Sequence, residues 1–93
     1  MDALDATSGA VVRALCRYWV THPRACDGLD GIARWWLSGV RVSTQTLEQA
    51  LEVLQRQGVA EVLNAADGRQ RWRRRDGVDD AVLRKVAADG PGP

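Results

Sequence analysis

Residues 43–62, STQTLEQALEVLQRQGVAEV, decide the fold of this chain of 93 residues. Apolar side chains recur here at intervals of three and four, a spacing that lines them up along one face of a helix. Ser43 can cap the first turn through its hydroxyl oxygen, and Gly58 can end the last turn with a left-handed backbone. The stretch predicts a helix over 43–57. Its buried stripe consists of Leu47, Ala50, Leu51 and Leu54.

Two extended segments, VAEVL and RQRWRRR, follow this helix and predict a β-hairpin over residues 59–75. The pair Asp67-Gly68 between them favours a tight turn. Successive side chains of a strand point to opposite faces, so Trp72 and Arg74 share one face, and we expect Trp72 to cover the helices. The opposite face points outward and carries four arginines: Arg69, Arg71, Arg73 and Arg75.

Two more helices are predicted ahead of this region. The first spans about 8–21 and ends before Pro23, since the residue preceding a proline is biased away from helical angles. The second spans about 28–38, with Asp27 placed to cap it. The core stripe of the first helix is predicted to consist of Val11, Val12, Leu15 and Trp19.

A short docking helix is predicted over 78–88, after the hairpin. Its expected core residues are spaced four apart: Val78, Val82 and Val86. The end of the chain, DGPGP at 89–93, reads as a disordered tail. Residues 1–88 are long enough for one domain with a single small core, but too short for a second core or a deep substrate cleft. We therefore expect a protein that is not an enzyme.

Three helices followed by a hairpin resemble the winged-helix branch of the helix-turn-helix proteins. The resemblance covers roughly residues 8–75 and rests on LEQALEVLQRQGVAEV, a glycine-containing turn and a strand that bears an aromatic residue. It implies a mainly α fold, namely a three-helix bundle with a two-stranded wing and a short C-terminal helix. In family members that bind DNA, the helix at 43–57 would enter the major groove, and the wing at 59–75 would contact the phosphate backbone or the minor groove.

Positive charge is concentrated in the predicted wing. Residues 69–75 hold five arginines and no acid, whereas residues 1–68 hold six arginines against eight acids, and the whole chain has a net charge of +1. Such a cluster is suited to phosphate contact, which makes affinity for nucleic acid steeply dependent on salt. A solvated edge strand is the alternative interpretation, because exposed charges also prevent strands from pairing between molecules.

The solvent face of the helix at 43–57 is less favourable to DNA, since Glu48 and Glu52 outnumber Arg56 there. Its first turn and the residue one turn further are neutral and can form hydrogen bonds with bases. These candidate contacts are Ser43, Thr44, Gln45 and Gln49. We expect a small bacterial-type transcriptional regulator that binds double-stranded DNA through this turn and the arginine-rich wing.

A winged-helix module that contacts proteins instead of DNA is the open alternative. Trp35 lies about 100° from Trp36 on a helical wheel and therefore outside the core stripe of the helix at 28–38. Tryptophan is enriched among interface hot spots, so Trp35 is the candidate partner contact. Alternatively, the N-terminal arm or the last helix covers it. A homodimer is compatible with either function.

The remaining features exclude several classes of function. Cys16, His22 and Cys26 are spaced C-x5-H-x3-C, which supplies only three zinc ligands and matches no common zinc module. We expect no metal, no cofactor and no disulfide. No apolar run approaches the ~20 residues of a membrane span, and the acidic start MDALDATSG lacks the features of a secretory signal. We expect a cytoplasmic protein.

Overall fold

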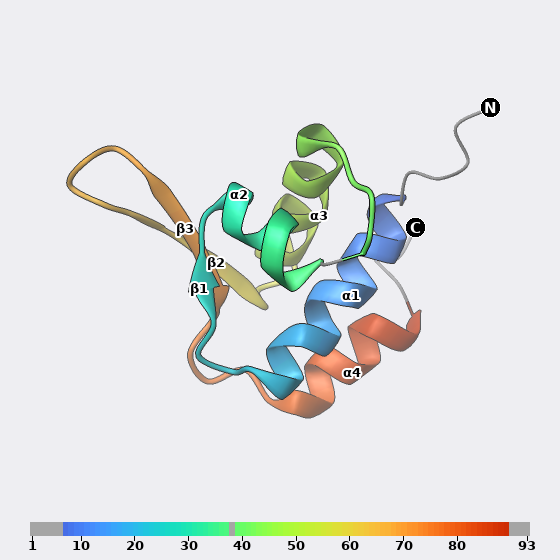
Figure 1. Ribbon diagram of the computed structural model, residues 1–93. Coiled ribbons are helices and arrows are strands. Elements are labelled where there is room, and N and C mark those ends of the chain that lie inside the picture. The colour runs from blue at the N-terminus through green and yellow to red at the C-terminus, as the bar shows by residue number, and fades with distance from the viewer. Residues whose placement is uncertain (1–6, 38, 90–93) are drawn as a thin grey trace.

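A computed structural model describes residues 7–37 and 39–89. The elements follow in the order α1 (Ser8–Thr21), β1 (Cys26–Asp27), α2 (Leu29–Gly31), η1 (Ile32–Trp36), α3 (Thr44–Arg56), β2 (Ala60–Asn64), β3 (Gln70–Arg74) and α4 (Asp80–Asp89). Figure 1 shows the β2–β3 hairpin projecting from a body of helices, with α4 on the far side of that body. The described chain is a mixed α/β fold with four helical regions and a three-stranded antiparallel sheet.

Ser43 and Gly58 set the limits of α3, as the sequence predicts. Ser43 Oγ accepts a hydrogen bond of 3.1 Å from the Thr46 amide and caps the first turn. Gly58 adopts a φ of 78°, and the Val59 amide then donates to the Leu54 carbonyl at 3.0 Å. The predicted stripes of α1 and α3 are buried, which confirms the helical periodicity of both segments.

The core lies where α1 packs against both α3 and α4. Trp19 is its largest fully buried side chain, and its indole nitrogen donates a hydrogen bond of 3.1 Å to the Ala25 carbonyl. Trp72 is only 7% exposed and closes the core from the sheet side, as strand alternation predicts. Burial of these two indoles gives the small core a large part of its apolar contact area.

The second helical region differs from the expected regular helix over 28–38. A three-residue α-helical turn, Leu29–Gly31, continues as the π-helix η1, in which the Leu37 amide donates to the Ile32 carbonyl at 3.0 Å. Ser38 lies outside the described residues. Ile32 and Leu37 are both buried, as their position within one arc of the helical wheel predicts, whereas the π-helical geometry of the segment was not predicted.

Trp36 faces the core and packs against two aromatic side chains of α1. Its ring stacks on Tyr18 at a centroid distance of 4.7 Å and meets the edge of Trp19 at 5.4 Å. Both distances fall within the range favoured for aromatic pairs. The contacts orient η1 against α1 and leave the neighbouring Trp35 on the outside of the turn.

The sheet has three strands, so the prediction of a two-stranded wing was incomplete. β1 pairs with β3 through Cys26↔Arg73 and Asp27↔Trp72, and the strand order is β1-β3-β2. Asp27 belongs to β1 and accepts a hydrogen bond from the Gly28 amide at 2.8 Å, so its expected capping role was wrong. A two-residue strand is too short to leave an alternating pattern in the sequence.

The hairpin forms from the two predicted segments, with its turn at the predicted place. β2 and β3 pair from Ala60↔Arg74 to Asn64↔Gln70. The Gly68 amide donates to the Ala65 carbonyl at 3.0 Å, and Gly68 has a φ of 84°, a conformation that strongly favours glycine. This tight reversal places the outward-facing side chains of the two strands side by side.

The last helix begins at Asp80, two residues later than predicted, and this shift changes its buried face. Leu83 is fully buried against the core, whereas Val82 is 44% exposed. The expected stripe of valines spaced four apart was therefore wrong at its centre. Gly77, with a φ of 85°, forms the turn that delays the helix. Of the predicted tail, residues 90–93 lie outside the described residues.

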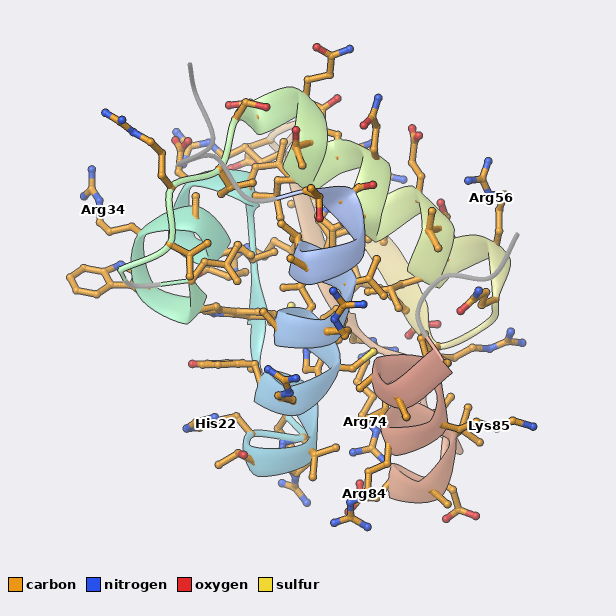
Figure 2. The ribbon with its side chains drawn as sticks, turned by 90° about the vertical axis from the view of Figure 1, so that its right-hand side faces the viewer. His22, Arg34, Arg56, Arg74, Arg84 and Lys85 are labelled. Atoms are coloured by element: carbon orange, nitrogen blue, oxygen red, sulfur yellow. The ribbon has the colours of Figure 1, made fainter. Side chains whose placement is uncertain are left out.

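Arg74 joins the sheet to two helices (Figure 2). Its guanidinium donates to the Trp19 carbonyl at 3.2 Å and to the Val78 carbonyl, and it lies 2.7 Å from Asp80 Oδ1. The side chain is only 11% exposed. Because hydrogen bonds from a charged donor contribute more than neutral ones, this residue is a structural clamp between β3, α1 and α4.

The clamp predicts that substitutions of two arginines in the same strand, Arg74 and Arg71, differ in their effect on the stability of the protein. Replacing Arg74 with methionine keeps much of the side-chain volume but removes the hydrogen bonds and leaves Asp80 without this partner. We expect the free energy of unfolding to fall by about 1.5–3 kcal/mol in urea titration. The exposed Arg71→Met variant of the same strand is the control and should change it by less than about 0.5 kcal/mol. Equal effects in the two variants would contradict the clamp.

Candidate nucleic-acid interface

Two of the predicted contact residues, Arg69 and Arg71, lie near the tip of the projecting hairpin. The Arg69 side chain is 83% exposed, and its Nε is 3.8 Å from Asp67 Oδ2, a distance and exposure that make the attraction weak. Arg71 is also exposed, and none of the carboxylates in the described ranges forms an ion pair with it. The hairpin tip therefore presents two guanidinium groups to solvent.

Arg73 lies on the same outer face, as predicted, but its charge is already paired. Its guanidinium forms a short ion pair with Glu61 on β2 and a longer one, at 3.7 Å, with Asp76. The hydrogen bond to Glu61 holds the pKa of Arg73 above its ordinary value. The expectation of four equivalent outward arginines was therefore too simple, because cross-strand pairing was not considered.

Arg75 is exposed but lies at the base of the hairpin instead of its tip. Its amide donates to the Val59 carbonyl at 3.0 Å, directly after the end of β3. Its guanidinium reaches toward Gly58, where a β-carbon would stand 3.5 Å from Nη1. The predicted wing contacts thus divide into two residues at the tip and two near the base.

An open groove separates the hairpin tip from the start of α2. Its volume is about 670 Å³, and it is lined by residues 27–31 on one side and 68–71 on the other. Asp27 and Asp30 are among the lining residues on one side, and Arg69 and Arg71 are among those on the other. The groove therefore has mixed charge, and the outer surface of the hairpin is the more favourable side for a polyanion.

The predicted contacts on α3 lie in its first turns. The Ser43 hydroxyl is occupied, since it accepts from the Thr46 amide and donates to Thr46 Oγ1 at 2.9 Å. Thr44, Gln45 and Gln49 are exposed. Within the described ranges, no hydrogen bond joins this surface to the arginines of the hairpin. The candidate contacts therefore come from two elements, α3 and the hairpin.

Trp35, the predicted partner contact, is 68% exposed on η1. The last helix does not cover it, because α4 packs against α1 instead. The N-terminal arm that was expected as the other cover includes residues 1–6, which lie outside the described residues. The structure therefore leaves a large aromatic surface open to solvent on the described part of the molecule.

Arg24 is a basic residue near the wing that sequence reasoning missed. Together with Pro23, Arg73, Arg74 and Asp76 it lines a cavity of about 400 Å³ at the base of the sheet. The pairing of β1 with β3 brings it there. Since that pairing leaves no periodic signal, nothing in the sequence pattern links Arg24 to the wing.

The three metal-ligand candidates are not assembled into a metal site. Cys16 is buried and Cys26 is exposed, and both thiols are free. No group of three histidine, cysteine or acidic side chains that could hold a metal occurs within residues 7–37 and 39–89. His22 instead stacks on Tyr18 at a centroid distance of 4.3 Å. None of the helices in this described part is long and apolar enough to cross a membrane.

Comparisons of the chain with protein-family models, with curated proteins and with solved structures found no match. The case for a function therefore rests on the residues and their arrangement.

The two thiols are expected to differ in reactivity. Burial raises the pKa of Cys16 to about 11, so at pH 8 only about one Cys16 thiol in a thousand would be ionised. Alkylation of the native protein at pH 8, followed by mass spectrometry, should label Cys26 and leave Cys16 unlabelled until denaturant is added. A Cys26→Ser variant should take up reagent only after unfolding. Comparable labelling of both cysteines in the native protein would refute this difference.

Proposed function

We propose that the chain is a winged-helix domain that binds double-stranded DNA as a small, non-enzymatic, cytoplasmic regulator of transcription. The main support is the pair Arg69 and Arg71, which are exposed near the tip of a tight hairpin. Figure 1 shows this hairpin projecting from the helical body. The order of three helical regions and then a hairpin agrees with this fold, and β1 extends the wing to a third strand.

The hairpin arginines would act through phosphate contacts. Each phosphate that a guanidinium neutralises releases condensed counterions, so the logarithm of the affinity falls with the logarithm of salt concentration by about 0.9 per contact. Arg73 contributes less in this proposal, because Glu61 already offsets its charge. Arg69 and Arg71 supply the main attraction, and Arg75 adds to it at the base of the hairpin.

The first turn of α3 would approach the bases. Thr44 and Gln45 are exposed and neutral, and both carry groups that can form hydrogen bonds with base edges. Ser43 has a supporting role, since its hydroxyl holds the helix start in place. Further along α3, the exposed Glu48 and Glu52 would repel phosphates. This distribution favours an approach by the end of the helix over one along its length.

Removing the two tip charges should reduce DNA binding. For an Arg69→Gln/Arg71→Gln variant we expect at least a tenfold loss of affinity for a labelled mixed-sequence duplex at low salt. The salt slope should fall by about two, because two phosphate contacts are lost. Fluorescence anisotropy measures both quantities. Arg73 is left unchanged in this variant so that its ion pair with Glu61 persists.

The control for this experiment removes the same amount of charge elsewhere. An Arg13→Gln/Lys85→Gln variant loses one charge from α1 and one from α4, away from the hairpin. Its affinity should stay within twofold of the wild type. Unchanged binding by a folded Arg69→Gln/Arg71→Gln variant would overturn the proposal, as would the absence of binding by the wild type at low salt.

A protein-contact module is the second candidate function, and the exposure of Trp35 favours it. A tryptophan with 68% of its surface in solvent can bury a large apolar area when a partner binds. The acidic solvent face of α3 also suits a protein partner better than a duplex. In this case the hairpin arginines would face water or an acidic protein surface.

A Trp35→Ala variant tests the second candidate without damaging the fold. Because the side chain is exposed, we expect the free energy of unfolding to change by less than about 0.5 kcal/mol, whereas Trp36→Ala should cost ~3 kcal/mol. Affinity capture from the native lysate should then recover a stoichiometric protein with the wild type but not with Trp35→Ala. Recovery of no protein, or equal recovery with both chains, counts against this candidate.

A further inference from the structure

A small pocket lies between α1 and α4, on the helical side of the molecule. It has a volume of about 220 Å³. Its apolar lining comes from Cys16 and Val20 on α1 and from Leu83 and Ala87 on α4. Because a water molecule occupies about 30 Å³, the pocket has room for a ligand of about seven or eight non-hydrogen atoms. That size corresponds to a small metabolite.

The floor of this pocket carries no charge. Burial raises the pKa of Cys16 to about 11, which keeps its thiol protonated at neutral pH. Leu83 is fully buried beneath the pocket. A protonated thiol behaves as a small apolar group, so the floor suits a short hydrocarbon chain.

The rim of the pocket is positively charged. Arg17 on α1 and Arg84 on α4 both line it, and no acidic residue does. Figure 2 shows Arg84 on the α1 side of α4 and Lys85 on the opposite side. The Thr21 hydroxyl, also at the rim, donates to the Arg17 carbonyl at 3.2 Å. A ligand here would meet two guanidinium groups next to an apolar surface.

Neither of these guanidinium groups is neutralised within the described ranges. Asp80, four residues before Arg84, is in the position from which an acid usually pairs with a base along a helix. Its carboxylate is instead bound by Arg74 at 2.7 Å. Arg17 likewise forms no ion pair with the carboxylates that the structure describes within residues 7–37 and 39–88. Both charges are therefore available to an anion.

We propose that the pocket between α1 and α4 binds a small amphiphilic monocarboxylate. The carboxylate lies between Arg17 and Arg84, each of which can donate two hydrogen bonds to it. The hydrocarbon part rests on Val20 and Ala87, above the buried Leu83. This binding site is separate from the hairpin and holds whether or not the protein binds DNA.

The test uses sodium hexanoate, which has eight non-hydrogen atoms and matches the volume of the pocket. In a titration of the full chain followed by amide NMR, we expect saturable shifts confined to the neighbourhood of residues 16–21 and 83–87 at concentrations up to about 10 mM. 1-Hexanol has a six-carbon hydrocarbon chain but no charge. Acetate and inorganic phosphate are charged but lack a hydrocarbon chain of that length. Each should bind at least tenfold more weakly than hexanoate.

Two variants separate the charged rim from the apolar floor. Arg17→Gln/Arg84→Gln should weaken hexanoate binding at least tenfold, while the Arg13→Gln/Lys85→Gln control should keep it within twofold. Ala87→Leu fills the pocket and should abolish binding with both arginines in place. The proposal is wrong if hexanoate causes no saturable shifts. It is also wrong if hexanol or acetate binds as well as hexanoate, or if either Arg17→Gln/Arg84→Gln or Ala87→Leu binds like the wild type.

Discussion

The contacts of the Arg74 guanidinium hold together three parts of the molecule that are distant in the chain. The side chain leaves the central strand of the sheet and contacts the Trp19 carbonyl in α1. It also binds the Val78 carbonyl just before α4 and the Asp80 carboxylate at the first residue of that helix. Since β3 also pairs with both other strands, its position determines where the hairpin projects. A charged group can occupy this position because carbonyl oxygens and one carboxylate replace its lost hydration.

Because Arg74 has this structural role, not every arginine of residues 69–75 contributes to the surface charge of the wing. The five arginines of residues 69–75 are close together in the sequence but do not share one role in the fold. Arg74 is a clamp, and Arg73 pairs with Glu61 across the strands. Arg69 and Arg71 keep their charges exposed at the hairpin tip. The surface charge of the wing is therefore smaller than its sequence suggests, but it is concentrated where a long polyanion could reach it.

The candidate binding surfaces are distributed over different elements. The hairpin tip is basic, the exposed face of α3 is acidic beyond its first turns, and Trp35 projects from η1. The pocket between α1 and α4 combines an apolar floor with a basic rim. Ligands of different chemistry can therefore be tested one at a time, because a substitution on one of these surfaces leaves the residues of the others in place.

The sequence by itself determined the features that depend on local periodicity and on turn chemistry. Helical spacing located α1 and α3 with their buried faces, Ser43 and Gly58 marked the ends of α3, and strand alternation turned Trp72 inward. Angular spacing also placed Trp35 outside the core. Only the tertiary structure decided the third strand, the π-helical turn, the late start of α4 and the pairing of Arg73 with Glu61. The third strand and the pairing of Arg73 with Glu61 arise from contacts between residues that are separated in the chain, and such contacts leave no periodic signal along it.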